Sequence, residues 1–278
     1  MTTVFVGPIR IELHSAFELT PWLWPFESYL RGAPHPALGA TWSLTIHTNE
    51  KPSDLQVEQG FFFKRHGLEF SADCEQRTAH LFGNGEEADF LAALELCMCL
   101  ACHQLGGLAI HGAAGVVNQN GWLMPGPSGT GKSTAARFGG FERVVGDERI
   151  LLLPSAHEGW QLVSTPFWSR GRTRVPEPFT HSLDAIVALE KRESLHLSQI
   201  SQAEALESLM RNIVYYGNDS RERDHLLETA LDVLSNTEQY RLGFPKDGPW
   251  AWTLDQMHSS FSRTRCEPSI FPSISIGI

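Results

Sequence analysis

The chain has 278 residues, of which 42% are hydrophobic and 19% charged, and its formal net charge at pH 7 is −10. This composition excludes a disordered or fibrous chain and supplies enough apolar side chains for one large domain or two small ones. The acidic balance argues against a nucleic-acid partner, because such proteins usually need a basic surface to neutralise phosphates.

Residues 1–85 contain short apolar runs separated by turn signals, a pattern typical of β-strands. The runs are VFVGPIRIEL, ATWSLTIHT and GFFFKRHGLEFSA. Between the first two, a stretch rich in Pro, Gly and aromatic residues indicates a loop with one helical turn. We therefore predict a smaller, mostly β N-terminal subdomain over residues 1–85 and a second domain over residues 86–278.

A helix is predicted over residues 88–105, where apolar residues recur at helical spacing before Gly106-Gly107. Within it, Cys99 to His103 fit the C-x-x-C-H pattern of haem attachment. Cysteines on an apolar helix are more often small buried hydrophobes, and a total of five cysteines does not favour a disulfide framework. We expect buried free thiols here rather than a haem site.

Residues 108–154 predict a β-hairpin, a glycine-rich loop, a short helix and another strand, in that order. GLAIHGAAGVV and GWLMPG flank a turn at residues 118–121, so the second hairpin strand leads directly into the loop. STAARFG then predicts the helix, and RVVGDERILLLP predicts an apolar strand interrupted by acidic residues. This order is the context that a phosphate-binding loop requires.

The loop matches G-x-x-x-x-G-K-[ST] at every fixed position. Glycines let the backbone wrap around a polyphosphate with N–H groups pointing inward, the lysine reaches the phosphates, and the following hydroxyl ligates Mg²⁺. The alternative is a glycine-rich turn that precedes a helix by chance. The candidate ATP-binding residues are Gly126, Pro127, Ser128, Gly129, Thr130, Gly131, Lys132, Ser133 and Thr134.

Asp147 and Glu148 interrupt the apolar strand that follows the loop. Acidic groups in a buried strand need a partner or a metal ion, and phosphoryl transfer needs a carboxylate near the metal. Together with Ser133, the two residues are candidate Mg²⁺ ligands. The alternative is a strand that ends at Gly146, with both carboxylates solvated in a turn.

His111 and a group of arginines complete the candidate residues. The position of His111, one hairpin ahead of the loop, is compatible with a place at the loop's mouth, although a histidine in an apolar strand is more often a packed core residue. Arg170, Arg172 and Arg174 alternate and would share one face of an extended segment. In an acidic protein this stripe indicates an anion site, for the nucleotide or an acidic substrate, with a solvated loop face as the alternative.

Two helices are predicted between residues 200 and 235, SQAEALESLMRNIVYYG and SRERDHLLETALDVLSN. The first begins with Ser201 and Glu204 in the spacing of a capping box. HSLDAIVALE before these helices and EQYRLGF after them predict strands.

The chain shows no targeting or membrane signal. Its N-terminus lacks a basic region followed by an apolar run, and no segment has the roughly 18 consecutive apolar residues of a membrane span. We expect a cytoplasmic protein with no membrane partner. The sequence does not determine the oligomeric state, and a homo-oligomer is one of the states that it allows.

These motifs resemble the catalytic domain of the HPr kinase/phosphorylase family: a strand with His111-Gly112, a hairpin, the GPSGTGKS loop and a strand with V-G-D-E at residues 145–148. The resemblance covers roughly residues 105–240, and its second half is similar to HPr-kinase-related proteins of bacterial gene clusters, including the serine kinases of lasso-peptide precursors. It implies an α/β fold with a P-loop nucleotide-binding core of the HPr kinase/phosphoenolpyruvate carboxykinase type. The N-terminal part does not resemble the N-terminal domain of true HPr kinases.

The resemblance also implies roles for the matching residues. Lys132 and the loop amides would hold the phosphates of ATP, and Ser133 would hold Mg²⁺. Asp147 matches the first residue of the family's Asp-Asp pair, the general base, whereas Glu148 replaces the second Asp and is one methylene longer. His111 matches a histidine at the mouth of the active site. The implied catalytic residues are Asp147, His111, Lys132, Arg170 and Arg172.

Three functions are compatible with these motifs and with the resemblance. The leading hypothesis is ATP-dependent phosphoryl transfer to a hydroxyl, that of a serine, in a peptide or small protein such as a lasso-type precursor. The second keeps the fold and changes the acceptor to a small molecule, and the third is a non-catalytic ATP-binding regulatory module. The presence of both Asp147 and His111 favours catalysis, because a nucleotide sensor needs neither.

Overall fold

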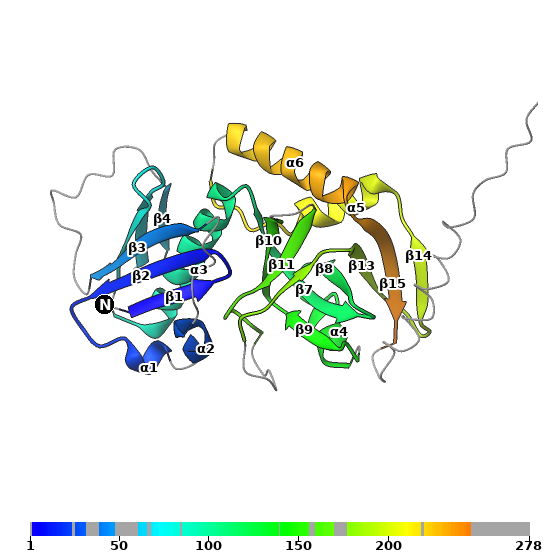
Figure 1. The fold of residues 1–278 in the computed structure, drawn as a ribbon, viewed down its shortest axis with the longest axis horizontal. Helices are drawn as coiled ribbons and strands as arrows, with labels where there is room; N and C mark the ends of the chain where they lie inside the picture. The colour runs from blue at the N-terminus through cyan, green and yellow to red at the C-terminus, as the bar shows by residue number, and fades with distance from the viewer. Residues whose placement is uncertain are drawn as a thin grey trace, which may run out of the picture.

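A computed structural model describes residues 2–23, 26–31, 39–47, 61–65, 68–83, 85–138, 140–155, 159–169, 177–217 and 220–245. The fold is mixed α/β and contains two sheets, which lie side by side with helix α3 (Glu87–Gln104) between them (Figure 1). Among the described helices, none is both long and apolar enough to cross a membrane.

The first sheet is formed by residues 2–82 and has the strand order β1-β2-β3-β6-β5-β4. Alternate residues of β2 and β3 are buried, as expected for strands with one face against a core. The three runs predicted to form strands do so, but the first contains both β1 and β2 and the third contains both β4 and β5. The sequence gives no prediction for β6, which pairs in parallel with β3, a distant part of the chain. The elements here are β1 (Thr2–Val6), β2 (Ile9–Ser15), α1 (Thr20–Leu23), α2 (Glu27–Leu30), β3 (Ala40–His47), β4 (Phe61–Arg65), β5 (Leu68–Asp73) and β6 (Thr78–Phe82).

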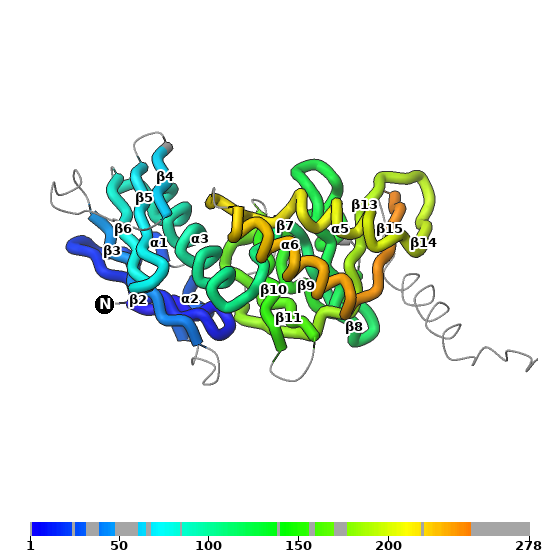
Figure 2. Tube along the Cα trace, turned by 90° about the horizontal axis from the view of Figure 1, so that it is seen from above, coloured from blue at the N-terminus to red at the C-terminus, as the bar shows by residue number. Residues whose placement is uncertain are grey.

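Helix α3 confirms the prediction of a helix over residues 88–105. It packs against β2, β3, β5 and β6 of the first sheet and against β7 and β10 of the second, so both of its sides are covered (Figure 2). This explains its apolar sequence, since a helix that is apolar on all sides is a buried helix. Cys97, Cys99 and Cys102 are buried free thiols, as predicted, and Cys266 lies outside the described residues.

The second sheet has the order β12-β11-β10-β7-β8-β13-β15-β14, and β9 also pairs with β7. Helices α5 and α6 pack together over one part of this sheet, and α4 contacts β7 (Figure 1). The elements are β7 (Leu108–Val117), β8 (Asn120–Pro125), α4 (Lys132–Phe138), β9 (Arg143–Gly146), β10 (Arg149–Pro154), β11 (Trp160–Ser164), β12 (Thr180–Ser182), β13 (Ala185–Lys191), β14 (His196–Gln199), α5 (Gln202–Met210), α6 (Ser220–Ser235) and β15 (Glu238–Phe244).

The predicted hairpin, the helix after the loop and the two later helices are all confirmed. Helix α5 begins with the predicted capping box, in which Ser201 and Glu204 exchange hydrogen bonds. It ends at Met210 rather than near residue 217, because the following residues pair with β7. Ile213 bridges Ile110, and the Val214 N–H donates to the Ala109 carbonyl at 2.7 Å.

Candidate functional site

The glycine-rich loop connects the end of β8 to the start of α4 and is folded tightly on itself. Gly129 and Gly131 have φ values of 86° and 106°, in the left-handed region that favours glycine. A Cβ on Gly131 would lie 2.7 Å from the ring of Phe244. The Thr130 hydroxyl donates to the Pro127 carbonyl at 2.9 Å. This turn therefore requires glycine at Gly131 for both its dihedral angle and its packing.

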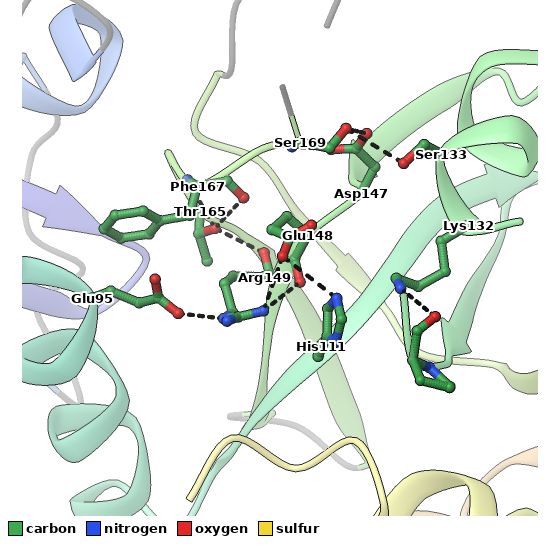
Figure 3. A network of polar contacts seen from close by, with 11 residues as sticks. Glu95, His111, Lys132, Ser133, Asp147, Glu148, Arg149, Thr165, Phe167 and Ser169 are labelled. Carbon is green, nitrogen blue, oxygen red and sulfur yellow. Dashed lines mark hydrogen bonds and ion pairs between the residues drawn. The ribbon is translucent and has the colours of Figure 1, made fainter. Parts of the chain in front are cut away.

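Lys132, the first residue of α4, is turned into the loop (Figure 3). It is only 5% exposed, and its Nζ donates a hydrogen bond to the Pro127 carbonyl at 3.0 Å. Burial lowers the pKa of Lys132, and the nearby carboxylate of Glu148 acts in the opposite direction. A buried ammonium group beside a glycine loop is suited to binding an anion.

Asp147 and Ser133 are joined through Ser169 (Figure 3). The Ser169 N–H donates to Asp147 Oδ1 at 2.9 Å and its hydroxyl donates to Asp147 Oδ2, while the Ser133 hydroxyl donates to Ser169 Oγ at 3.4 Å. Strand β9 does end at Gly146, but Asp147 is buried rather than solvated in a turn. Both acidic residues lie between β9 and β10, which pair with successive parts of β7.

His111 and Glu148 form a second group beside the loop. His111 Nε2 lies 3.4 Å from Glu148 Oε1, and the His111 carbonyl accepts a hydrogen bond from the Gly126 N–H at 3.3 Å. Burial lowers the pKa of His111, and the charge of Lys132 lowers it further. A neutral imidazole is therefore favoured here, near the ammonium of Lys132.

Arg149 connects this group to helix α3. Its Nη1 lies 3.4 Å from Glu148 Oε1, and its Nε donates to the carboxylate of Glu95 on α3 (Figure 3). The sequence analysis did not identify Ser169, Arg149 or Glu95 as site residues, because none of them belongs to a recognisable motif. Their contacts, Ser169 with Asp147 and Arg149 with Glu95, join residues that are distant in the chain. Arg170, Arg172 and Arg174 lie outside the described residues.

The donor set near the loop fits Mg²⁺. Ser133 supplies a hydroxyl oxygen and Asp147 a carboxylate, the hard oxygen ligands that this ion prefers. One or two protein ligands suffice, because Mg²⁺ in such sites keeps water and phosphate oxygens as its other ligands. The carboxylate of Glu148 instead contacts His111 and Arg149.

A protein-family model described as SynChlorMet cassette protein ScmC matches residues 86–256, which is more than half of the chain. The chain belongs to the ScmC family. The ScmC match covers α3, the second sheet and every described residue of the site, whereas the first sheet lies before it. No match was found among curated proteins.

Proposed function

We propose that this ScmC-family protein is an ATP-dependent kinase that transfers the γ-phosphoryl group to a serine hydroxyl of a peptide or small protein. The observation that carries the proposal is the position of Asp147, a buried carboxylate linked through Ser169 to Ser133 of a glycine loop that also holds the buried Lys132. Together these groups provide a cation for phosphate, oxygen ligands for a metal ion and a base for the acceptor.

In the proposed reaction the loop amides and Lys132 hold the phosphates, and Ser133 and Asp147 lie where Mg²⁺ would be held. Bound Mg²⁺ supplies positive charge that neutralises the phosphate oxygens. Asp147, oriented by Ser169, receives the proton of the acceptor hydroxyl. The oxygen of that hydroxyl bonds to the γ-phosphorus of ATP, and the bond between the γ-phosphorus and the bridging oxygen breaks, so that ADP leaves. His111, whose ring lies beside the carboxylate of Glu148, would contact the acceptor.

A peptide acceptor is supported by the resemblance to peptide serine kinases. The ScmC description refers to its members as cassette proteins, so peptides encoded beside the gene are the first acceptors to test. We place the reaction in the cytoplasm. The free thiols of Cys74, Cys97, Cys99 and Cys102 suit a reducing compartment.

The test is mass spectrometry of those peptides after incubation with the full chain, ATP and Mg²⁺. The proposal predicts a gain of one phosphoryl group that requires ATP and disappears with Lys132→Ala and with Asp147→Asn. A peptide that gains the group equally with both variants would show that another activity is responsible. If ATP binds but no peptide is modified, the acceptor is a small molecule or the chain is a nucleotide sensor, and the peptide-kinase proposal fails.

A further inference from the structure

A cavity of about 790 Å³ lies outside the site described above, where β4, the end of α3, residues 215–217 and the start of α6 meet. Its walls include the aromatic rings of Phe61, Tyr215 and Tyr216. Tyr216 is held between two residues of β4, with ring centroids 6.1 Å from both Phe61 and Phe63. The cavity is therefore bounded by aromatic surfaces whose positions are set by packing.

The charged groups that line this cavity are acidic. Glu75 and Glu222 are exposed at its rim, and the described lining residues include no lysine or arginine. The cavity also lies at the C-terminal end of the 18-residue helix α3, where the helix dipole is negative. The N-terminus of α6 carries the positive end of its helix dipole, but the negative charge of Glu222 in the first turn of α6 offsets this positive charge.

His103, in the last turn of α3, is a further polar group in the lining. Its Nε2 is buried and has no hydrogen-bond partner in the part of the chain that the structure describes. Burial lowers the pKa of His103 to about 4, so the ring is neutral at pH 7 and adds no positive charge. A buried polar atom without a partner is costly unless a ligand or water reaches it.

The cavity is adjacent to the proposed catalytic group. Burial is the main reason that the pKa of the Tyr216 phenol is raised to about 12. Arg149 lies beside this phenol, and its charge and its hydrogen bond act in the opposite direction. The same segment pairs with β7, where the His111 N–H donates to the Asn212 carbonyl at 2.8 Å. Val214 pairs with Ala109 of β7. Ala109 precedes His111 by two residues, a separation of about 7 Å along a strand.

We propose that this cavity binds a basic side chain of the acceptor peptide, with the aliphatic part of that side chain against Tyr216 and Phe61 and its cation beside Glu222. Aromatic faces and carboxylates both attract a cation, and the rings also cover an aliphatic stem. The assignment to an acceptor peptide rests on the proposed kinase function, whereas the recognition of a cation rests on the cavity alone.

The experiment is a titration of the full chain, with ¹³C-labelled histidine rings, by acetyl-Gly-Lys-Gly-amide and by the matched norleucine peptide. The resonances of His103 and His225 report on the cavity, and that of His196, exposed on β14, is the internal reference. We expect saturable shifts of His103 and His225 and about fivefold tighter binding of the lysine peptide. Pentylammonium serves as the free-amine probe, and all solutions lack nucleotide.

Glu222→Gln tests the carboxylate, and Glu228→Gln is its matched control, because it removes the same charge from an exposed position of the same helix. We expect Glu222→Gln to lower the affinity for the lysine peptide about threefold and Glu228→Gln to leave this affinity unchanged. Equal binding of the two peptides, or equal weakening by both variants, would overturn the proposal. Binding of pentylammonium without binding of the lysine peptide would overturn the peptide assignment.

Because no ATP is present, this experiment is independent of the kinase test. A chain that binds the lysine peptide but not ATP would refute the kinase and with it the acceptor role of the cavity. A chain that phosphorylates a peptide but fails to distinguish lysine from norleucine would refute the cavity assignment alone.

Discussion

Ser169 holds both carboxylate oxygens of Asp147, donating its N–H to Oδ1 at 2.9 Å and its hydroxyl to Oδ2. The two residues are on different segments, and the second sheet brings them together. A carboxylate fixed at both oxygens has one orientation, which favours proton transfer from an acceptor held in one position. We therefore assign Ser169 as a positioning residue of the proposed site.

Ser169→Ala removes the hydroxyl that donates to Asp147 and leaves the backbone donor in place. We expect kcat for phosphoryl transfer to fall roughly tenfold, within the range seen when supporting hydrogen bonds are removed, with little change in the KM for ATP. Ser169→Thr keeps a hydroxyl and is expected to restore much of the rate. Steady-state kinetics of the three proteins, together with their thermal unfolding temperatures, will check this. If Ser169→Ala lowers the unfolding temperature and Ser169→Thr fails to rescue kcat, the role is structural.

Asp147→Asn removes the proposed base without changing the size of the side chain. We expect phosphoryl transfer to fall at least about 100-fold while ATP binding is retained, because a general base contributes about that much to the rate. Asp224→Asn, at an exposed position on α6, is the control and is expected to keep full activity. More than a tenth of the wild-type turnover in Asp147→Asn would rule out the base assignment.

Lys132→Ala removes the buried ammonium group that faces the loop. We expect a loss of ATP-dependent phosphoryl transfer of at least about 100-fold and a weaker affinity for ATP, since a charged donor to phosphate is lost from a site shielded from water. Lys191→Ala, exposed on β13, removes the same charge and is expected to have no effect. Calorimetric titration with ATP·Mg²⁺ measures the affinity. Equal affinities of the two variants would contradict the proposed phosphate site.

Arg149→Met leaves the carboxylate of Glu95, whose side chain is 21% exposed, without its cationic partner. We expect the free energy of unfolding to fall by about 3 kcal/mol, as is typical when one member of a largely buried ion pair is removed. The double variant Glu95→Leu/Arg149→Met removes both charges and should lose less than the sum of the two single variants. Urea unfolding of all four proteins gives the coupling. Additive losses would mean that the contact between α3 and β10 does not depend on this pair.

Because His103 is buried in the folded chain, we expect the free energy of unfolding to fall in acid. Its pKa is lowered to about 4 by burial, and the unfolded chain has the ordinary value of about 6.5. Between these pH values the unfolded chain binds a proton that the folded chain does not, so this contribution is complete above pH 6.5 and is lost as the pH falls toward 4. The loss is up to roughly 3 kcal/mol. Urea unfolding from pH 7 to pH 4 should show a shallower decline for His103→Gln than for the wild type, whereas the exposed control His196→Gln should follow the wild type.

The local elements were predictable because their signals lie in neighbouring residues. The apolar period of α3, the turn between β7 and β8, and the Ser201–Glu204 capping box all act within a few residues, and the structure has each of them. Strand β6 and the early end of α5 were not predictable, because each depends on pairing with a strand distant in the sequence.

The sequence by itself determined which residues belong to the glycine loop, since the backbone angles of Gly129 and Gly131 and the packing of Gly131 depend on residue type. It also singled out Asp147 and Glu148 as acidic residues that interrupt an apolar run, which the structure divides into β9 and β10. Only the tertiary structure separated their environments, placing Asp147 against Ser169 and Glu148 between His111 and Arg149. The physical reason is that a side chain's partners are set by which strands lie beside it, and the order β10-β7-β8 arises from pairing across the whole second sheet.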